Sequence, residues 1–264
     1  MRFVLPVLGV CLVIGLFLAN KAERYALPSK NRQGQSKLPL HRKRKMSRTP
    51  EREPQQLRKV PSYFLLTKLI DSMRQGLKGF KRYSFYGLKR IYKCGRYLPE
   101  EKMRVSIDRE TGSAHIVWLD KRKQRQEVWW PVGESDRRLI ARGPGWRHIF
   151  EVKIDPLSKM AMKDTLHPIY EVGFDYMLKL FEEQLRLVRE LNVDIKVKDC
   201  SDDKRLCVEV EFPKEKYPQF YCYRAKIELD RDMHLPSRVM VWDVVDSKLR
   251  LVEDYSYWDI REEG

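Results

Sequence analysis

The chain has 264 residues, a formal net charge of +16 and 42% hydrophobic residues, which suffices for one domain of ordinary size plus extensions. Much of the basic excess lies in one stretch, because residues 21–60 contain 13 Lys and Arg against 3 Asp and Glu. This distribution argues against a nucleic-acid-binding domain, which would carry such an excess on its folded surface.

The chain begins with an apolar segment. Residues 3–19 carry no charge and follow Arg2, a pattern typical of an export signal. A helix of this length would span roughly 25 Å, at the short end for a transmembrane helix. Residues 1–20 are therefore predicted to be either a cleaved signal peptide or an uncleaved signal-anchor held in the inner membrane by residues 3–19. Both alternatives place the remainder of the chain outside the cytoplasm.

Residues 21–60 are rich in Pro, Gln, Ser, Lys and Arg and contain few large apolar residues, which predicts a basic disordered linker. The run RKRK at residues 42–45 is its most basic part. Two interpretations remain open for it: a solvated tether, or a contact with anionic lipid headgroups or another polyanion.

The folded part is predicted to span residues 61–264 and to begin with a helix. Ser62 is placed to cap this helix, and its apolar face would consist of Phe64, Leu65, Leu69, Ile70, Met73 and Leu77. A second, longer helix is predicted over residues 168–191, with Pro168 suited to its first turn.

Strand-like patterns surround the long helix, and turn-forming residues separate them. The eleven predicted strands are residues 83–92, 103–108, 114–119, 126–132, 138–142, 146–154, 193–199, 205–212, 220–229, 237–245 and 248–258. This order predicts a mainly β (α+β) fold built on an antiparallel meander. Such a sheet must close on itself or be covered to bury its apolar face.

The strand predicted over residues 146–154 alternates apolar and charged positions, which is typical of a half-buried strand. The long helix carries an apolar stripe that includes Met177, Leu180, Phe181 and Val188. We expect this stripe to be buried against strand residues such as Phe150 and Val152.

Several segments together resemble the bacterial family known as domain of unknown function 1571. They are MRVSIDRETGSAHIVWL, EVWWPVG, LIARGPGW, IDPLSKMAMKDTLHPIYEVG, IELDRDMHLPSRVMVWD and EDYSYWDI. The resemblance covers most of residues 61–264, and the His-Pro-Ile segment with its following Gly is among its most distinctive parts. It implies kinship with Lol-type lipoprotein carriers, in which an antiparallel half-barrel is plugged by helices. The resemblance brings no known reaction. Together with the predicted export segment it indicates the bacterial cell envelope, with the domain either anchored on the extracytoplasmic side of the membrane or secreted to the periplasm.

Four cysteines lie in the predicted domain: Cys94, Cys200, Cys207 and Cys222. If the hairpin between the strands at 205–212 and 220–229 is centred on residues 213–218, Cys207 and Cys222 stand nearly opposite on the same polar face. A disulfide between them is one interpretation, and reduced thiols at ordinary sheet positions are the other.

No catalytic motif, metal-binding spacing or cofactor fingerprint occurs in the sequence, so no catalytic residue, metal or cofactor is predicted. His167 is the histidine most suited to a specific task, and bracing a loop or capping a helix is favoured over catalysis.

Aromatic and aliphatic side chains are the remaining candidates. A half-barrel lined by them would offer an apolar pocket suited to acyl chains, although many must simply fill the core. The ligand-lining candidates are Trp118, Trp130, Phe150, Met177, Phe181 and Trp242. We therefore expect a non-enzymatic envelope domain that binds a lipid, a lipoprotein acyl chain or another hydrophobic ligand. The alternative is a membrane-anchored interaction or structural module with a fully plugged inner face.

Overall fold

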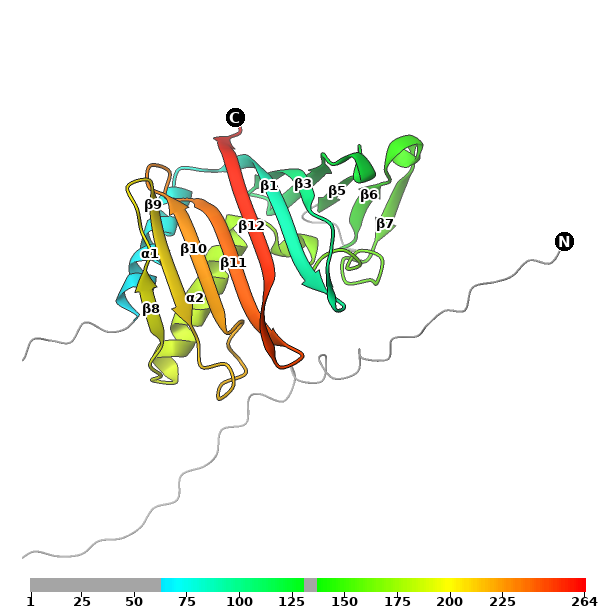
Figure 1. Ribbon diagram of the computed structural model, residues 1–264. Coiled ribbons are helices and arrows are strands. Elements are labelled where there is room, and N and C mark those ends of the chain that lie inside the picture. Colours follow the sequence, from blue (N-terminus) through cyan, green and yellow to red (C-terminus); the bar gives the residue numbers. More distant parts are fainter. Residues whose placement is uncertain (1–62, 131–136) are drawn as a thin grey trace, which may run out of the picture. The chain divides into compact units, whose positions relative to one another are not determined.

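The computed structural model describes residues 63–130 and 137–264. Within these ranges the chain forms two α-helices, α1 (Phe64–Leu77) and α2 (Phe174–Glu190), and a 12-stranded antiparallel sheet (Figure 1). The strands are β1 (Arg82–Lys93), β2 (Arg96–Tyr97), β3 (Glu101–Asp108), β4 (Ser113–Trp118), β5 (Glu127–Trp130), β6 (Leu139–Arg142), β7 (Glu151–Ile154), β8 (Lys196–Asp199), β9 (Arg205–Glu211), β10 (Arg224–Asp230), β11 (Pro236–Val245) and β12 (Lys248–Glu262). Short 3₁₀ helices are η2 (Lys121–Lys123), η3 (Gly145–Ile149) and η4 (Ile169–Glu171).

The sheet consists of two meanders that meet in its middle. Its strand order is β7-β6-β5-β4-β3-β1-β12-β11-β10-β9-β8, so the first and last long strands pair with each other. Gly87 of β1 stands opposite Tyr257 of β12 at this seam. Because β7 and β8 lie at opposite ends, the sheet is open. The predicted antiparallel half-barrel is therefore confirmed, and each of the eleven predicted strands has its counterpart.

The two helices cover one face of the sheet, here called the inner face. Figure 1 shows both of them behind the strands β8 to β12. Helix α1 packs on β8, β9 and α2, and it buries Leu66, Leu69, Ile70, Met73 and Leu77. The predicted apolar face was one residue out of phase at its start, because Phe64 is 53% exposed and Leu66 is buried. Ser62 lies outside the described residues.

Helix α2 begins later than predicted. Residues 169–171 form the separate turn η4, and α2 starts at Phe174. Gly173 separates the two with a φ of +97°, a left-handed conformation that favours glycine. A Cβ at Gly173 would also lie 2.9 Å from the Tyr83 hydroxyl oxygen. That hydroxyl accepts a hydrogen bond of 2.9 Å from the backbone N–H of Phe174 and thereby caps the helix.

The half-buried strand predicted over residues 146–154 is wrong in its first half. Residues 145–149 form η3, and only residues 151–154 join the sheet as β7. Phe150 and Val152 are 55% and 51% exposed, so they are not buried against α2. The alternation places Val152 on the inner face, but the helices lie over the other end of the sheet and leave this face uncovered.

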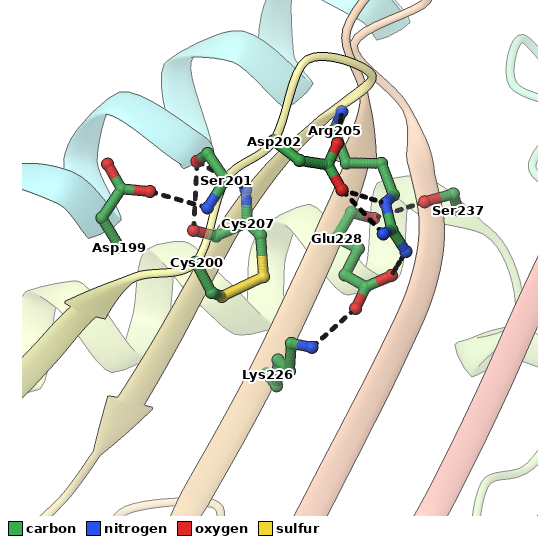
Figure 2. Close-up of a disulfide and its surroundings, with 9 residues drawn as sticks. All are labelled: Asp199, Cys200, Ser201, Asp202, Arg205, Cys207, Lys226, Glu228 and Ser237. Carbon is green, nitrogen blue, oxygen red and sulfur yellow. Dashed lines mark hydrogen bonds and ion pairs between the residues drawn. A yellow bond between two sulfur atoms is a disulfide. The ribbon is translucent and has the colours of Figure 1, made fainter.

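The predicted pairing of Cys207 with Cys222 is also wrong, because Cys207 is bonded to Cys200 across the β8–β9 turn (Figure 2). The prediction centred the next hairpin too early. Residues 213–223 form a long loop, so Cys207 stands opposite Glu228. Cys222 lies in that loop as a buried free thiol, and burial raises its pKa to about 12.

Candidate functional site

An apolar cavity of about 580 Å³ lies between α2 and the inner face of the sheet. From the helix, Phe174, Met177, Leu180, Phe181 and Gln184 line it. Its other walls are inner-face residues of both meanders, among them Phe85, Met103, Val105, Ile116, Val128, Ala225, Ile227, Val239 and Val241. Ligand sites for small hydrophobic molecules have volumes of about 300–1,000 Å³. The helix therefore covers the sheet without filling the space beneath it.

Gly87 creates part of this space. It lies in the middle of β1, between the inward-facing Phe85 and Lys89, where any other residue would place a side chain in the cavity. A Cβ added there would meet only ordinary contacts, 3.7 Å from side-chain atoms of Met103 and Phe85. A glycine inside a strand often marks a place where another molecule approaches the backbone closely. Here it leaves room at the centre of the sheet.

The structure brings together three of the six ligand-lining candidates. Trp118, Met177 and Phe181 line the cavity. Whether they contact a ligand remains a prediction.

The other three candidates lie elsewhere. Trp130 packs beside Tyr170, with ring centroids 5.4 Å apart, and Phe150 is exposed beyond the cavity. Trp242 neighbours the inward-facing Val241 in sequence and so points to the outer face, where the Arg224 guanidinium lies 4.5 Å from its ring centroid.

A cluster of charged side chains lies at one wall of the cavity. The ammonium group of Lys89 lies 2.8 Å from the Glu101 carboxylate, and that of Lys123 lies 2.5 Å from it. Lys123 also pairs with Asp164 at 3.0 Å, while the Trp118 indole donates to Glu101. Burial alone would raise the pKa of Glu101, but the two lysines outweigh it and lower the pKa. The cluster attaches the loop over residues 155–168 to the sheet.

A second polar cluster centres on His167. Its Nδ1 lies 3.0 Å from the Glu171 carboxylate, and its Nε2 lies 2.9 Å from the carboxylate of the buried Glu253 in β12. The Tyr221 hydroxyl contacts both His167 and Glu253. Burial opposes protonation of the imidazole, but the two carboxylates outweigh it and raise the pKa of His167 to about 9. His167 therefore braces the loop that leads into η4 and α2.

These clusters were largely missing from the sequence-based prediction. Lys89, Glu101, Lys123 and Asp164 are scattered over 76 positions, and each reads as an ordinary surface charge in its own segment. Tyr221 belongs to a loop that was predicted as strand. Only His167 gave a signal, through its position before Pro168 at a predicted helix start.

The cavity presents mainly apolar walls, and its buried charged groups are paired with one another. The buried charges at the cavity wall are already paired: Lys89 and Lys123 with acidic groups, and Glu253 with His167. Gln184 accepts a 2.8 Å hydrogen bond from the Tyr221 N–H, which leaves its amide nitrogen as a donor at the cavity wall. Over the described ranges, no group of three or more His, Cys, Asp or Glu residues is arranged to hold a metal ion.

Neither helix in the part of the chain that the structure describes is long and apolar enough to cross a membrane. The segment at residues 3–19 and the linker at 21–60 lie outside the described residues, so the assignments of both remain predictions, as do the domain boundaries at positions 20 and 60.

The sequence was compared with models of known protein families. The profile of a family described as protein of unknown function (DUF1571) matches residues 80–264. A search of curated proteins gave no match to the sequence.

Comparison with solved structures gives several partial similarities. A DUF1329 family protein from Desulfovibrio piger is 13% identical, with a TM-score of 0.37, over 77% of this chain and 94% of that one. A LolA superfamily protein from Nitrosomonas europaea is 8% identical, with a TM-score of 0.31, over 78% and 95%. The lipoprotein LppX from Mycobacterium tuberculosis is 12% identical, with a TM-score of 0.39, over 76% and 96%. At these scores the similarities imply nothing about what this chain binds.

Proposed function

We propose that this chain, which belongs to the DUF1571 family, is a non-enzymatic cell-envelope protein that binds an acyl chain or similar hydrophobic ligand in the cavity under α2. The observation that supports this most directly is the cavity itself. An apolar space of about 580 Å³ lowers packing density in a domain core. Such a space would be costly to keep empty and favourable to fill with apolar surface.

The orientation of the ligand follows from the polarity of the walls. The apolar chain would lie among Phe85, Met103 and Phe181, deep in the cavity. The polar end would lie at the mouth, where Val152, Met160 and Lys163 line the cavity and are also exposed. Because the inner charges already have partners, a charged headgroup would be costly to bury and is better accommodated at the mouth.

A larger side chain at position 87, which would fill part of the cavity, tests whether the cavity binds the acyl chain. The Gly87→Leu side chain would occupy the space that we assign to the acyl chain without contacting backbone closely. We expect the wild-type chain to bind cis-parinaric acid, seen as a rise in its fluorescence, and Gly87→Leu to bind it at least about tenfold more weakly, or ~1.4 kcal/mol. Circular dichroism and urea unfolding should show that the variant is folded.

Gly79→Leu is the matched control, because a side chain there meets no atom within 4 Å and Gly79 is exposed. It should bind the probe like the wild type. If the wild-type chain does not bind cis-parinaric acid, or if Gly87→Leu binds it equally well, the cavity is not the ligand site. The interaction or structural module would then be the better description.

A further inference from the structure

Exposed apolar side chains concentrate in one segment beside the cavity. Thirteen large hydrophobic residues of the described ranges are exposed, and six of them lie within residues 146–160. We call these six the apolar rim: Trp146, Ile149, Phe150, Val152, Leu157 and Met160, which are between 51% and 77% exposed. Scattered apolar residues are normal on a protein surface, but such a concentration marks a site of interaction.

The apolar rim surrounds β7, the strand at one end of the sheet. Trp146 and Ile149 belong to η3, which precedes this strand, and Leu157 and Met160 lie in the loop that follows it. Figure 1 shows β7 at the opposite end of the sheet from α1 and β8. Val152 and Met160 also line the cavity. The apolar rim is therefore continuous with the mouth of the cavity.

The charges of the same segment are mainly basic. Arg147, Lys159 and Lys163 are exposed, and the Arg147 guanidinium lies 5.7 Å from the ring centroid of Trp146. The acidic side chains are engaged locally. Glu151 forms a 2.5 Å ion pair with Arg142, and Asp155 accepts a 2.9 Å hydrogen bond from the backbone N–H of Leu157. Tryptophan and aliphatic residues bordered by Lys and Arg are typical of surfaces that insert into the headgroup region of anionic membranes.

We propose that the apolar rim docks on the surface of an anionic lipid bilayer. Trp146, Phe150 and Leu157 would enter the boundary between headgroups and acyl chains, while the exposed basic side chains contact the lipid phosphates. Docking in this way brings the mouth of the cavity to the bilayer. The proposal concerns a surface and holds whether or not the cavity takes up a lipid.

A local probe on the full chain tests this proposal, because residues 3–19 could bind membranes by themselves without affecting a site-specific signal. In a background with Cys11→Ser and Cys94→Ser, which removes the thiol of the segment at residues 3–19 and the exposed free thiol of the described residues, Leu157→Cys is labelled with the environment-sensitive dye NBD. Leu249→Cys is the matched control, since Leu249 is a similarly exposed leucine (48% against 63%) in another part of the sheet. Vesicles contain phosphatidylcholine with or without phosphatidylglycerol, plus brominated lipid as a quencher.

We expect the dye at position 157 to shift to the blue and to be quenched several-fold more than the dye at position 249 when phosphatidylglycerol is present. Trp146→Ser with Phe150→Ser should reduce this quenching, and Lys159→Glu should weaken it in the anionic vesicles. Gly87→Leu should leave it unchanged, which separates docking from filling of the cavity.

Equal quenching at both positions would contradict the proposal. A dye at position 157 that is already blue-shifted in buffer would contradict it as well, because another segment of the chain or a second copy would then cover the apolar rim. If a partner strand added to the free edge of β7 were the true occupant, vesicles would leave the dye unchanged.

Discussion

The two halves of the sheet differ in how their inner faces are covered. Under α1 and α2, residues such as Val208 and Ile227 are at most 1% exposed. Beyond the helices, β5 and β7 contain no buried residue at all, and β6 buries only Leu139. Both halves carry apolar residues on this face. The comparison shows that coverage, rather than the pattern of the strands, decides which part of the inner face becomes core and which part, at β5 to β7, stays accessible.

The two edge strands, β8 and β7, also differ in how firmly they are held to the rest of the sheet. The β8 edge is linked to β9 by the disulfide between Cys200 and Cys207, and the turn beside it is held by ion pairs of Arg205 with Asp202 and Glu228 (Figure 2). The strand β7 lies at the opposite edge, beside the apolar rim. The sheet is thus cross-linked at the β8 edge, which the helices cover, and exposes apolar residues at the β7 edge.

The same substitution in each half should give the largest contrast. Leu69 of α1 is fully buried, whereas Leu157 of the apolar rim is 63% exposed. We expect Leu69→Ala to lower the free energy of unfolding by about 4 kcal/mol and Leu157→Ala to change it by less than about 0.5 kcal/mol. Urea unfolding measures both values. Equal losses would mean that the apolar rim is also packed in solution.

The His167 cluster joins the halves, because it attaches the loop before α2 to β12 at the seam. A raised pKa means that its contribution to stability is complete below the unfolded pKa of about 6.5 and is lost as the pH rises through about 9. The difference in unfolding free energy between the wild type and His167→Asn should therefore shrink by roughly 3 kcal/mol between pH 6.5 and pH 10.

Urea unfolding at both pH values checks this, with His234→Asn in the turn before β11 as a control for the loss of an imidazole. A difference that stayed constant or grew with pH would show that protonated His167 does not hold the seam together.

The disulfide should contribute the smallest of these effects. It closes a short loop, because the two cysteines have a sequence separation of only 7. Replacing both with Ser should lower the free energy of unfolding by roughly 2 kcal/mol, because the unfolded chain gains freedom. Cys94→Ser, at an exposed free thiol, should have almost no effect. Peptide mapping without reduction should find Cys200 linked to Cys207. A link between Cys207 and Cys222 would contradict the structure.

The sequence alone predicted the elements of this fold well. Alternation of apolar and polar residues has a period of two in strands, and β3 shows it directly, with buried residues at alternate positions from Glu101 to Ile107. Helical spacing likewise predicted both helices and buried positions such as Phe181 and Val188. These patterns are local, since each side chain's direction depends on its neighbours along the chain. Eleven of the twelve strands and their antiparallel meander order could therefore be predicted, whereas the half-barrel was expected from the family resemblance.

The tertiary structure alone decided what these elements enclose. Phe150 and Val152 have a regular strand-like pattern, yet they are exposed because α2 ends its coverage elsewhere. Cys207 pairs with Cys200 because the register of a hairpin depends on where its loop begins, and a small shift moves every partner. Lys89, Glu101 and Asp164 meet only when distant segments come together, and the space beside Gly87 exists only once α2 lies across it. Contacts of this kind depend on long-range packing, which a local pattern does not encode.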